Sequence, residues 1–105
     1  MISTKEVAKL MNAIEYQDSS VVSKEIVKGK TGSVTLFAFD KGQGLSEHTA
    51  PFDALVNILD GEAEIIISGK SFNPKAGDII IMPANEPHAL KAIHRFKMML
   101  VMIKS

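Results

Sequence analysis

The sequence contains no cysteine, and its 12 basic and 12 acidic side chains leave a formal net charge of zero. The lack of cysteine excludes disulfide bonds, thiolate metal ligands and a cysteine nucleophile. The balanced charge gives no electrostatic reason to expect nucleic acid or an anionic membrane surface as a partner. We therefore expect neither of these two partners.

Long apolar runs are also lacking. The longest, such as Met98–Ile103, fall far short of the ~20 residues that a helix needs to span a bilayer. Near the amino terminus, Lys5, Glu6 and Lys9 interrupt the apolar residues, which is not the pattern of a signal peptide. We expect a single domain, because a chain of 105 residues has the commonest domain size. Since neither a membrane span nor a signal peptide is predicted, we expect the protein in the cytoplasm.

The first 18 residues are predicted to form a helical segment that packs on the remaining domain, residues 19–105. Ser3 and Glu6 have the spacing of a capping box, which would satisfy free amides at the start of a helix. A helix of three turns is marginal alone and must dock on something. Its expected apolar face consists of Val7, Leu10, Met11 and Ile14.

After Asp18 the sequence changes to short runs rich in Val, Ile, Phe and Thr, separated by glycine and proline. Asp60-Gly61 and Gly69-Lys70 supply the positive φ that tight hairpin turns require. Evenly spaced short strands with turns between them indicate an all-β sandwich or barrel. The expected strands are Val21–Val27, Ser33–Asp40, Ala54–Leu59, Ala63–Ser68, Lys70–Asn73, Ile79–Met82, His88–Ile93 and Lys97–Ile103.

Several of these strands are apolar on both faces. Examples are Ile65–Ile67, Ile79–Met82 and Met98–Ile103. A small barrel needs only its inner face to be apolar, so the surplus predicts that outer faces are also covered. The cover could be the amino-terminal helix, a second sheet or another subunit, and we favour a homodimer because symmetric pairing commonly buries such a surface.

Two segments carry a specific spacing of glycine, proline and histidine. In the first, Gly42, His48 and Gly61 stand at the intervals of one half of the cupin signature. In the second, Gly77, Pro83 and His88 keep the intervals of the other half, and Asn85 replaces the turn glycine. Asparagine also tolerates positive φ. From about Thr31 to Lys104 the chain therefore resembles a small single-domain cupin.

This resemblance implies a double-stranded β-helix, also called a jelly roll, with a metal or ligand site inside the barrel. In cupins two histidines and a glutamate of the first motif and one histidine of the second hold a divalent metal. His48 and His88 match the first and the last of these ligands, but Ala50 and Ala54 stand at the other two positions. The last position of the second motif is Ala92 rather than asparagine. The sequence thus predicts a degenerate metal centre.

Asp53 is the candidate that could restore a His-His-carboxylate set with His48 and His88, because it precedes the vacated glutamate position by one residue. Such a set suits a single divalent ion, namely iron, manganese, zinc or nickel. Asp53 could instead cap a turn through backbone amides, and the two histidines could be neutral, hydrogen-bonded remnants. Glu47 and His94 are weaker candidates.

The predicted interior pocket is expected to bind a small molecule, because a concave, mostly apolar pocket with a few polar groups is the usual form of such a site. Our leading hypothesis is a binding protein for such a ligand with a weakened metal centre. The alternatives are a metal-dependent isomerase, decarboxylase or dioxygenase that uses His48, His88 and Asp53, and a non-catalytic dimeric scaffold with a filled interior. The expected pocket residues are His48, Ala50, Asp53, Ala54, Leu55, Met82 and His88, with Phe37, Phe39 or Phe96 nearby.

Overall fold

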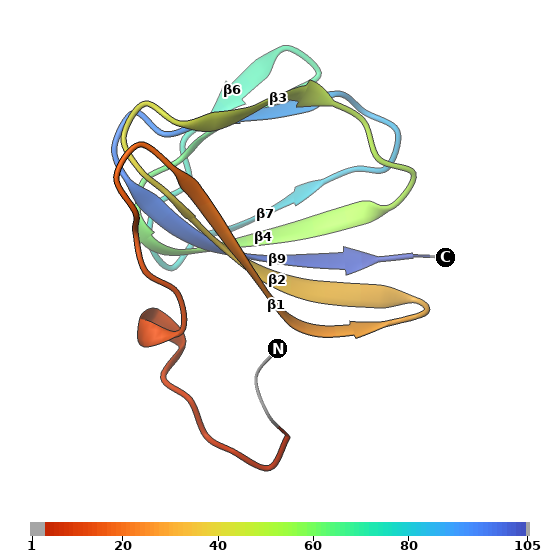
Figure 1. The fold of residues 1–105 in the computed structure, drawn as a ribbon. Helices are drawn as coiled ribbons and strands as arrows, with labels where there is room; N and C mark the ends of the chain where they lie inside the picture. The colour runs from red at the N-terminus through yellow and green to blue at the C-terminus, as the bar shows by residue number, and fades with distance from the viewer. Residues whose placement is uncertain (1–3, 105) are drawn as a thin grey trace.

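Two antiparallel sheets face each other in the computed structural model, which describes residues 4–104 (Figure 1). One sheet has five strands in the order β1-β2-β9-β4-β7, and the other has four in the order β3-β8-β5-β6. The strands of the first sheet are β1 (Val21–Gly29), β2 (Gly32–Phe39), β9 (Phe96–Ile103), β4 (Asp53–Gly61) and β7 (Ile79–Met82). Those of the second are β3 (Gly44–His48), β8 (His88–Lys91), β5 (Glu64–Ile67) and β6 (Lys70–Phe72).

The main core lies between the two sheets. Alternate residues of each strand point into it, as the period of two in a β-strand requires. On β4 these are Ala54, Val56 and Ile58, all of them buried. Phe39 of β2 and Phe96 of β9 are fully buried, and their rings stack with centroids 4.4 Å apart. The inner faces of β4 and β9 and the end of β2 therefore form a continuous apolar surface.

The predicted all-β class is confirmed, and each of the eight predicted strands corresponds to an observed one. The strand β3 was not predicted, because two glycines precede its single core-facing apolar residue, Leu45. Its backbone pairs with β8, so a distant partner makes this segment a strand.

The predicted amino-terminal helix is wrong. The segment contains only a single 3-10 turn, Leu10–Asn12, and the proposed cap residue Ser3 lies outside the described residues. Of the expected apolar face, Ile14 is buried, whereas Val7 is fully exposed and Leu10 and Met11 are about 40% exposed. Among residues 4–104 no helix is long and apolar enough to cross a membrane.

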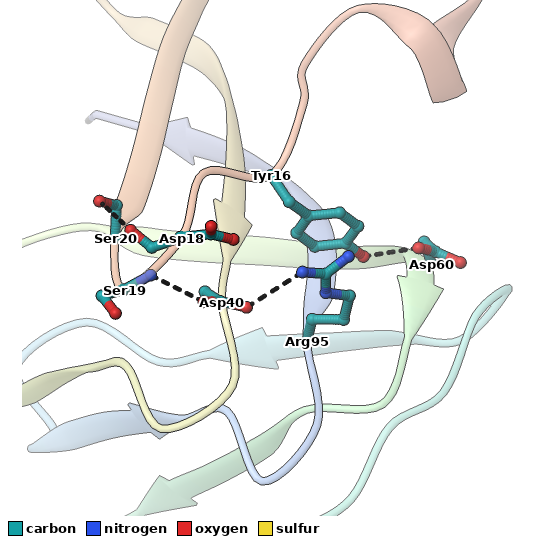
Figure 2. Close-up of polar contacts among 7 residues, drawn as sticks. All are labelled: Tyr16, Asp18, Ser19, Ser20, Asp40, Asp60 and Arg95. Atoms are coloured by element: carbon teal, nitrogen blue, oxygen red, sulfur yellow. Dashed lines mark hydrogen bonds and ion pairs between the residues drawn. The ribbon is translucent and has the colours of Figure 1, made fainter.

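The amino-terminal segment lies on the outer side of the five-stranded sheet, away from the second sheet (Figure 1). Ile14 packs there on Leu36 and Ala38 of β2. A polar cluster fastens the adjoining Tyr16, as Figure 2 shows. The Tyr16 hydroxyl donates to Asp60, and the Arg95 guanidinium lies over the Tyr16 ring at 4.5 Å from its centroid.

The same arginine connects this cluster to the start of β1. Arg95 donates to one carboxylate oxygen of Asp40, and the backbone amide of Ser19 donates to the other (Figure 2). Hydrogen bonds from Ser19 and Lys41 are the main reason that the pKa of Asp40 lies below its usual value. Burial and the bond to Asp60 raise the pKa of Tyr16. The chain before β1 is thus held through Tyr16 and Ser19 by three charged side chains, those of Asp40, Asp60 and Arg95.

Candidate functional site

His48 and His88 meet at the same end of the four-stranded sheet. His48 is the last residue of β3, His88 is the first of β8, and the two are cross-strand partners. Their Nε2 atoms lie 3.1 Å apart, and the rings meet edge to face with centroids 4.3 Å apart. His88 is only 5% exposed, whereas His48 is exposed on one side. Residues 40 positions apart are thus brought together by strand pairing.

Backbone carbonyl oxygens favour the same tautomer for both rings. His48 Nδ1 lies 2.7 Å from the carbonyl oxygen of Ser46, and His88 Nδ1 lies 3.3 Å from that of Glu86. Because a carbonyl only accepts, each of these contacts is a hydrogen bond when Nδ1 carries the proton and donates. In the neutral rings both Nε2 atoms then hold lone pairs, and these two lone pairs converge. A proton between the two Nε2 atoms, carried by one of the rings or donated by a third group, would satisfy both lone pairs.

The environment of His88 limits how many protons the pair can hold. Burial lowers the pKa of His88, and the neighbouring His48 lowers it further, while the bond to the Glu86 carbonyl opposes both effects. A first proton shared between the two Nε2 atoms would relieve the lone-pair conflict, but a second proton would place two charged rings in contact. In the neutral form with the proton on Nδ1, each ring presents its Nε2 as a hydrogen-bond acceptor.

These acceptors open into an apolar pocket with a volume of about 250 Å³. Ala54 of β4 stands on the pocket wall and is flanked in register by Met82 of β7 and Met102 of β9. The short alanine side chain leaves space beside the two methionines. The complete lining consists of Leu45, His48, Ala50, Phe52, Ala54, Met82, His88, Leu90, Met98, Leu100 and Met102.

Five of the seven predicted pocket residues line this pocket: His48, Ala50, Ala54, Met82 and His88. The placement of Asp53 and Leu55 in the pocket was wrong, because neighbours of Ala54 on a strand point to the opposite face of the sheet. Phe39 and Phe96 lie deeper in the core and do not line it. Sequence reasoning missed Leu45, Phe52, Leu90, Met98, Leu100 and Met102. The alternation along β9 was the signal that could have found the last three.

Asp53 has a structural role instead. Its carboxylate accepts a hydrogen bond of 2.8 Å from the backbone amide of Ala84, in the loop that follows β7. The alternative role predicted for Asp53 was to cap a turn through backbone amides. Asp53 does accept from a backbone amide, but this amide belongs to a loop that is distant in the sequence. Glu47 is exposed, and the exposed His94 borders a different, smaller cavity beside Ile93. Neither residue lines the histidine pocket.

The loop after β7 also shapes the rim of the pocket. Asn85 adopts a φ of 65°, as expected where asparagine replaces a turn glycine. Its backbone amide donates to the carbonyl oxygen of Ala50 at 2.8 Å. This bond ties together the two motif segments that carry His48 and His88.

The donor set does not fit a divalent-metal centre of the kind that the resemblance implies. Two imidazoles are present, but Ala50 and Ala54 offer only methyl groups at the positions of the other two ligands. Across residues 4–104 no three His, Cys, Asp or Glu side chains are grouped closely enough to hold a metal ion. Zinc and non-haem iron sites usually take at least three protein ligands, so the two imidazoles are too few to form such a site.

Comparisons with known proteins agree with this architecture. The family model described as "Cupin domain" matches residues 35–104. The chain belongs to the cupin domain family. The predicted cupin-type barrel is therefore confirmed, and it includes both histidines of the pocket. No curated protein matches the chain significantly.

Solved structures of cupins are similar over nearly the whole chain. A conserved protein of unknown function from Streptococcus pyogenes is 36% identical with a TM-score of 0.93, over 99% of this chain and 91% of that one. A cupin 2 conserved barrel domain protein from Leptotrichia buccalis is 43% identical with a TM-score of 0.88, over 90% of this chain and 46% of that one. A cupin superfamily protein from Desulfitobacterium hafniense is 27% identical with a TM-score of 0.92, over 99% and 95%.

Proposed function

We propose that this cupin binds a small, mainly apolar molecule that carries one weakly acidic O–H or N–H group. The observation that carries the proposal is the convergence of two Nε2 lone pairs at the polar end of an apolar pocket. A ligand donor placed between His48 and His88 would satisfy both acceptors. The rest of the ligand would contact methionine, leucine and alanine side chains.

The size of the pocket limits the ligand. Its volume of about 250 Å³ lies below the ~300–1,000 Å³ of pockets for drug-sized molecules. An engineered apolar cavity of roughly 150 Å³ already holds benzene. A single substituted ring, or an aliphatic molecule of similar size, therefore suits this pocket. The three methionines supply adaptable, polarisable walls for such a shape.

The alternative hypotheses have less support. A filled interior, which the scaffold hypothesis predicts, is at odds with a pocket of this volume. A metal-dependent enzyme would need a third protein ligand, and the carboxylate of Asp53 is bonded to the Ala84 amide outside the pocket. We therefore derive no metal-dependent reaction step. The cytoplasmic location stays a prediction.

The proposal is tested with a matched pair of probes, p-cresol and its methyl ether 4-methylanisole. The two have nearly the same shape, but only p-cresol can donate a proton to the histidines. We expect p-cresol to bind at least about tenfold more tightly in an NMR titration, which corresponds to the ~1.4 kcal/mol of one hydrogen bond. The preference should disappear in the variants His48→Ala and His88→Ala.

His94→Ala is the matched control, because His94 is exposed and lies outside the pocket. This variant should keep the preference for p-cresol. Equal affinity of the two probes for the unmodified protein would contradict the proposed role of the histidines. No binding of either probe, or of a broad set of single-ring fragments, would contradict a binding pocket altogether.

A further inference from the structure

The pocket-facing row of strand β9 is followed by a lysine. Met98, Leu100 and Met102 line the pocket, and Lys104 is the next residue of the same parity, so its side chain leaves the backbone on the same side. The pairing of β9 with β2 extends this far, because the Lys104 amide donates to the carbonyl oxygen of Thr31 at 2.8 Å. The chain is therefore still extended where it presents this ammonium group.

The pocket reaches solvent beside the loop between β3 and β4. His48, at the end of β3, is exposed, and Ala50 and Phe52 of the loop are half-buried, whereas Met98 is buried. We call this end of the pocket the mouth. The carboxyl end of β9 lies at the same end of the two sheets, because Ile103 pairs with the first residue of β4 (Figure 1). The histidine pair and the lysine after β9 therefore belong to opposite sheets at one mouth.

The ammonium group of Lys104 lies beside an aromatic wall of the pocket. Its Nζ atom is 5.8 Å from the centroid of the Phe52 ring, and Phe52 lines the pocket. Lys104 is itself half-buried, which places its positive charge next to apolar side chains at the mouth. Electrostatic attraction is stronger in such surroundings than in open water.

None of residues 4–104 neutralises this charge. Within that range Lys104 Nζ forms neither an ion pair nor a hydrogen bond. Asp53 pairs with Ile103, the residue before Lys104, but the Asp53 carboxylate accepts from the Ala84 amide instead. Lys30, in the turn that holds the Lys104 amide through Thr31, adds a second positive charge near the same end. The mouth is therefore suited to an anion.

We propose that Lys104 receives a carboxylate of the ligand, so that the pocket selects a small hydroxy acid. This inference rests on the proposed function, in which His48 and His88 accept the ligand's O–H group. The two polar groups of the ligand would be separated by an apolar body of about one ring, which the methionine and leucine side chains contact. A single lysine matches the one negative charge of a carboxylate, whereas a phosphate group carries nearly two.

4-Hydroxybenzoate and p-cresol are the matched probes for this inference. They share the phenol group and differ in the substituent opposite to it, which is a carboxylate in one and a methyl group in the other. The measurement is the ratio of their two dissociation constants, by NMR titration at neutral pH and low salt. The variant is Lys104→Met, which removes the charge but keeps a long side chain over Phe52.

Lys70→Met is the matched control. Lys70 also holds its Nζ atom over a phenylalanine ring, at 5.3 Å from the centroid of Phe72, but neither of these residues lines the pocket. Lys104→Met should shift the ratio by at least about fivefold against 4-hydroxybenzoate, the size of a partly screened ion pair. Its affinity for p-cresol should change less than twofold. Lys70→Met and Lys104→Arg should leave the ratio unchanged.

Added salt provides a second measurement, because it screens an ion pair at the mouth. Salt should weaken the binding of 4-hydroxybenzoate to the unmodified protein and leave that of p-cresol unchanged. An equal ratio in Lys104→Met and the unmodified protein would overturn the role of Lys104, as would an equal shift in Lys70→Met. In both cases the binding of p-cresol through the histidines would still stand. If neither phenol bound, the proposed function would fail together with this inference.

Discussion

Both faces of the five-stranded sheet carry apolar side chains, but the two faces differ in side-chain size and in what lies opposite them. The inner face has alanine and methionine around a pocket, at Ala54, Met82 and Met102, and two imidazoles face it from the second sheet. The outer face has branched aliphatic side chains that are cross-strand neighbours, such as Val101, Leu55 and Ile81. Small and flexible residues leave room for a ligand on the inner face, whereas the amino-terminal segment packs on part of the outer face through Ile14.

The largest difference between the two faces is expected in the free energy of unfolding, when a residue at the centre of the core is compared with one on the outer face. Phe96→Ala should lower the free energy of unfolding by about 3–5 kcal/mol, because Phe96 is fully buried and stacks on Phe39. Ile81→Ala should cost less than about 1 kcal/mol, since Ile81 is largely exposed. Denaturant titration measures both. Equal losses would mean that the outer face is packed by its own chain.

The next effect concerns the vacated metal positions. In Ala50→His/Ala54→Glu both new side chains would enter the pocket, since both alanines line it. A metal site loses roughly 10–100-fold in affinity when a residue that only hydrogen-bonds to a ligand is removed. Because the variant adds two direct ligands, its affinity for zinc should rise by at least about 100-fold. Calorimetric titration with Zn²⁺ measures the change.

A control for this variant comes from the opposite face of the same strand. In Ala50→His/Leu55→Glu the carboxylate would point outward, because Leu55 and Ala54 have opposite parity. This control should gain much less affinity for zinc. Tight zinc binding by the unmodified protein would instead show that the two imidazoles suffice, and our interpretation of the donor set would be wrong.

A smaller effect is expected from pH. The pKa of His88 is held below the usual 6.5 by burial and by His48, whereas the unfolded chain protonates near ~6.5. As the pH falls through this value, the unfolded state takes up a proton that the native state resists. The contribution to stability is therefore complete above about pH 6.5 and decreases as the pH falls toward the lowered native pKa.

Denaturant titrations at several pH values measure this dependence. His88→Gln should reduce the loss of stability between neutral and mildly acidic pH, whereas the exposed His94→Gln should leave it unchanged. His48→Ala should raise the pKa of His88, because a repelling neighbour is removed and water gains access. Identical pH dependence of His88→Gln and the unmodified protein would refute the assignment to His88.

The smallest effect is expected at the anchor of the amino-terminal segment. Tyr16→Phe removes the hydroxyl that donates to Asp60 but keeps the ring beneath Arg95. We expect a loss of about 1 kcal/mol, the usual net value of a partly exposed hydrogen bond. Faster amide hydrogen exchange should be confined to the residues around Ile14. A slowed or unchanged exchange there would show that the apolar contact alone holds the segment.

The strand pattern and the histidine pair could be predicted from the sequence, because they rest on local signals. Alternation, turn residues and the spacing around His48 and His88 need no knowledge of distant contacts. Asp53 and Leu55 were misplaced because the sequence does not give the parity of β4 relative to the core. A shift of one residue in the register of a strand moves each side chain to the opposite face of the sheet.

The amino-terminal helix shows a second limit. Val7, Leu10, Met11 and Ile14 have helical spacing, but a short helix depends on a surface that receives its whole apolar stripe. The structure instead uses Ile14 and Tyr16, two residues apart, as extended-chain contacts with the sheet. Tertiary anchoring at these two residues therefore outweighs the local pattern. Strand β3 is the reverse case, in which pairing with β8 makes a strand from a weak pattern.

The protonation of the two imidazoles tests the central claim most directly. Nitrogen-15 NMR of histidine-labelled protein at mildly alkaline pH distinguishes protonated from unprotonated ring nitrogens. The account predicts protonated Nδ1 and unprotonated Nε2 on both His48 and His88, with both Nε2 signals shifting when p-cresol is added. A protonated Nε2 on either ring would mean that the pair already satisfies itself, and it would contradict the claim that two free acceptors face the pocket.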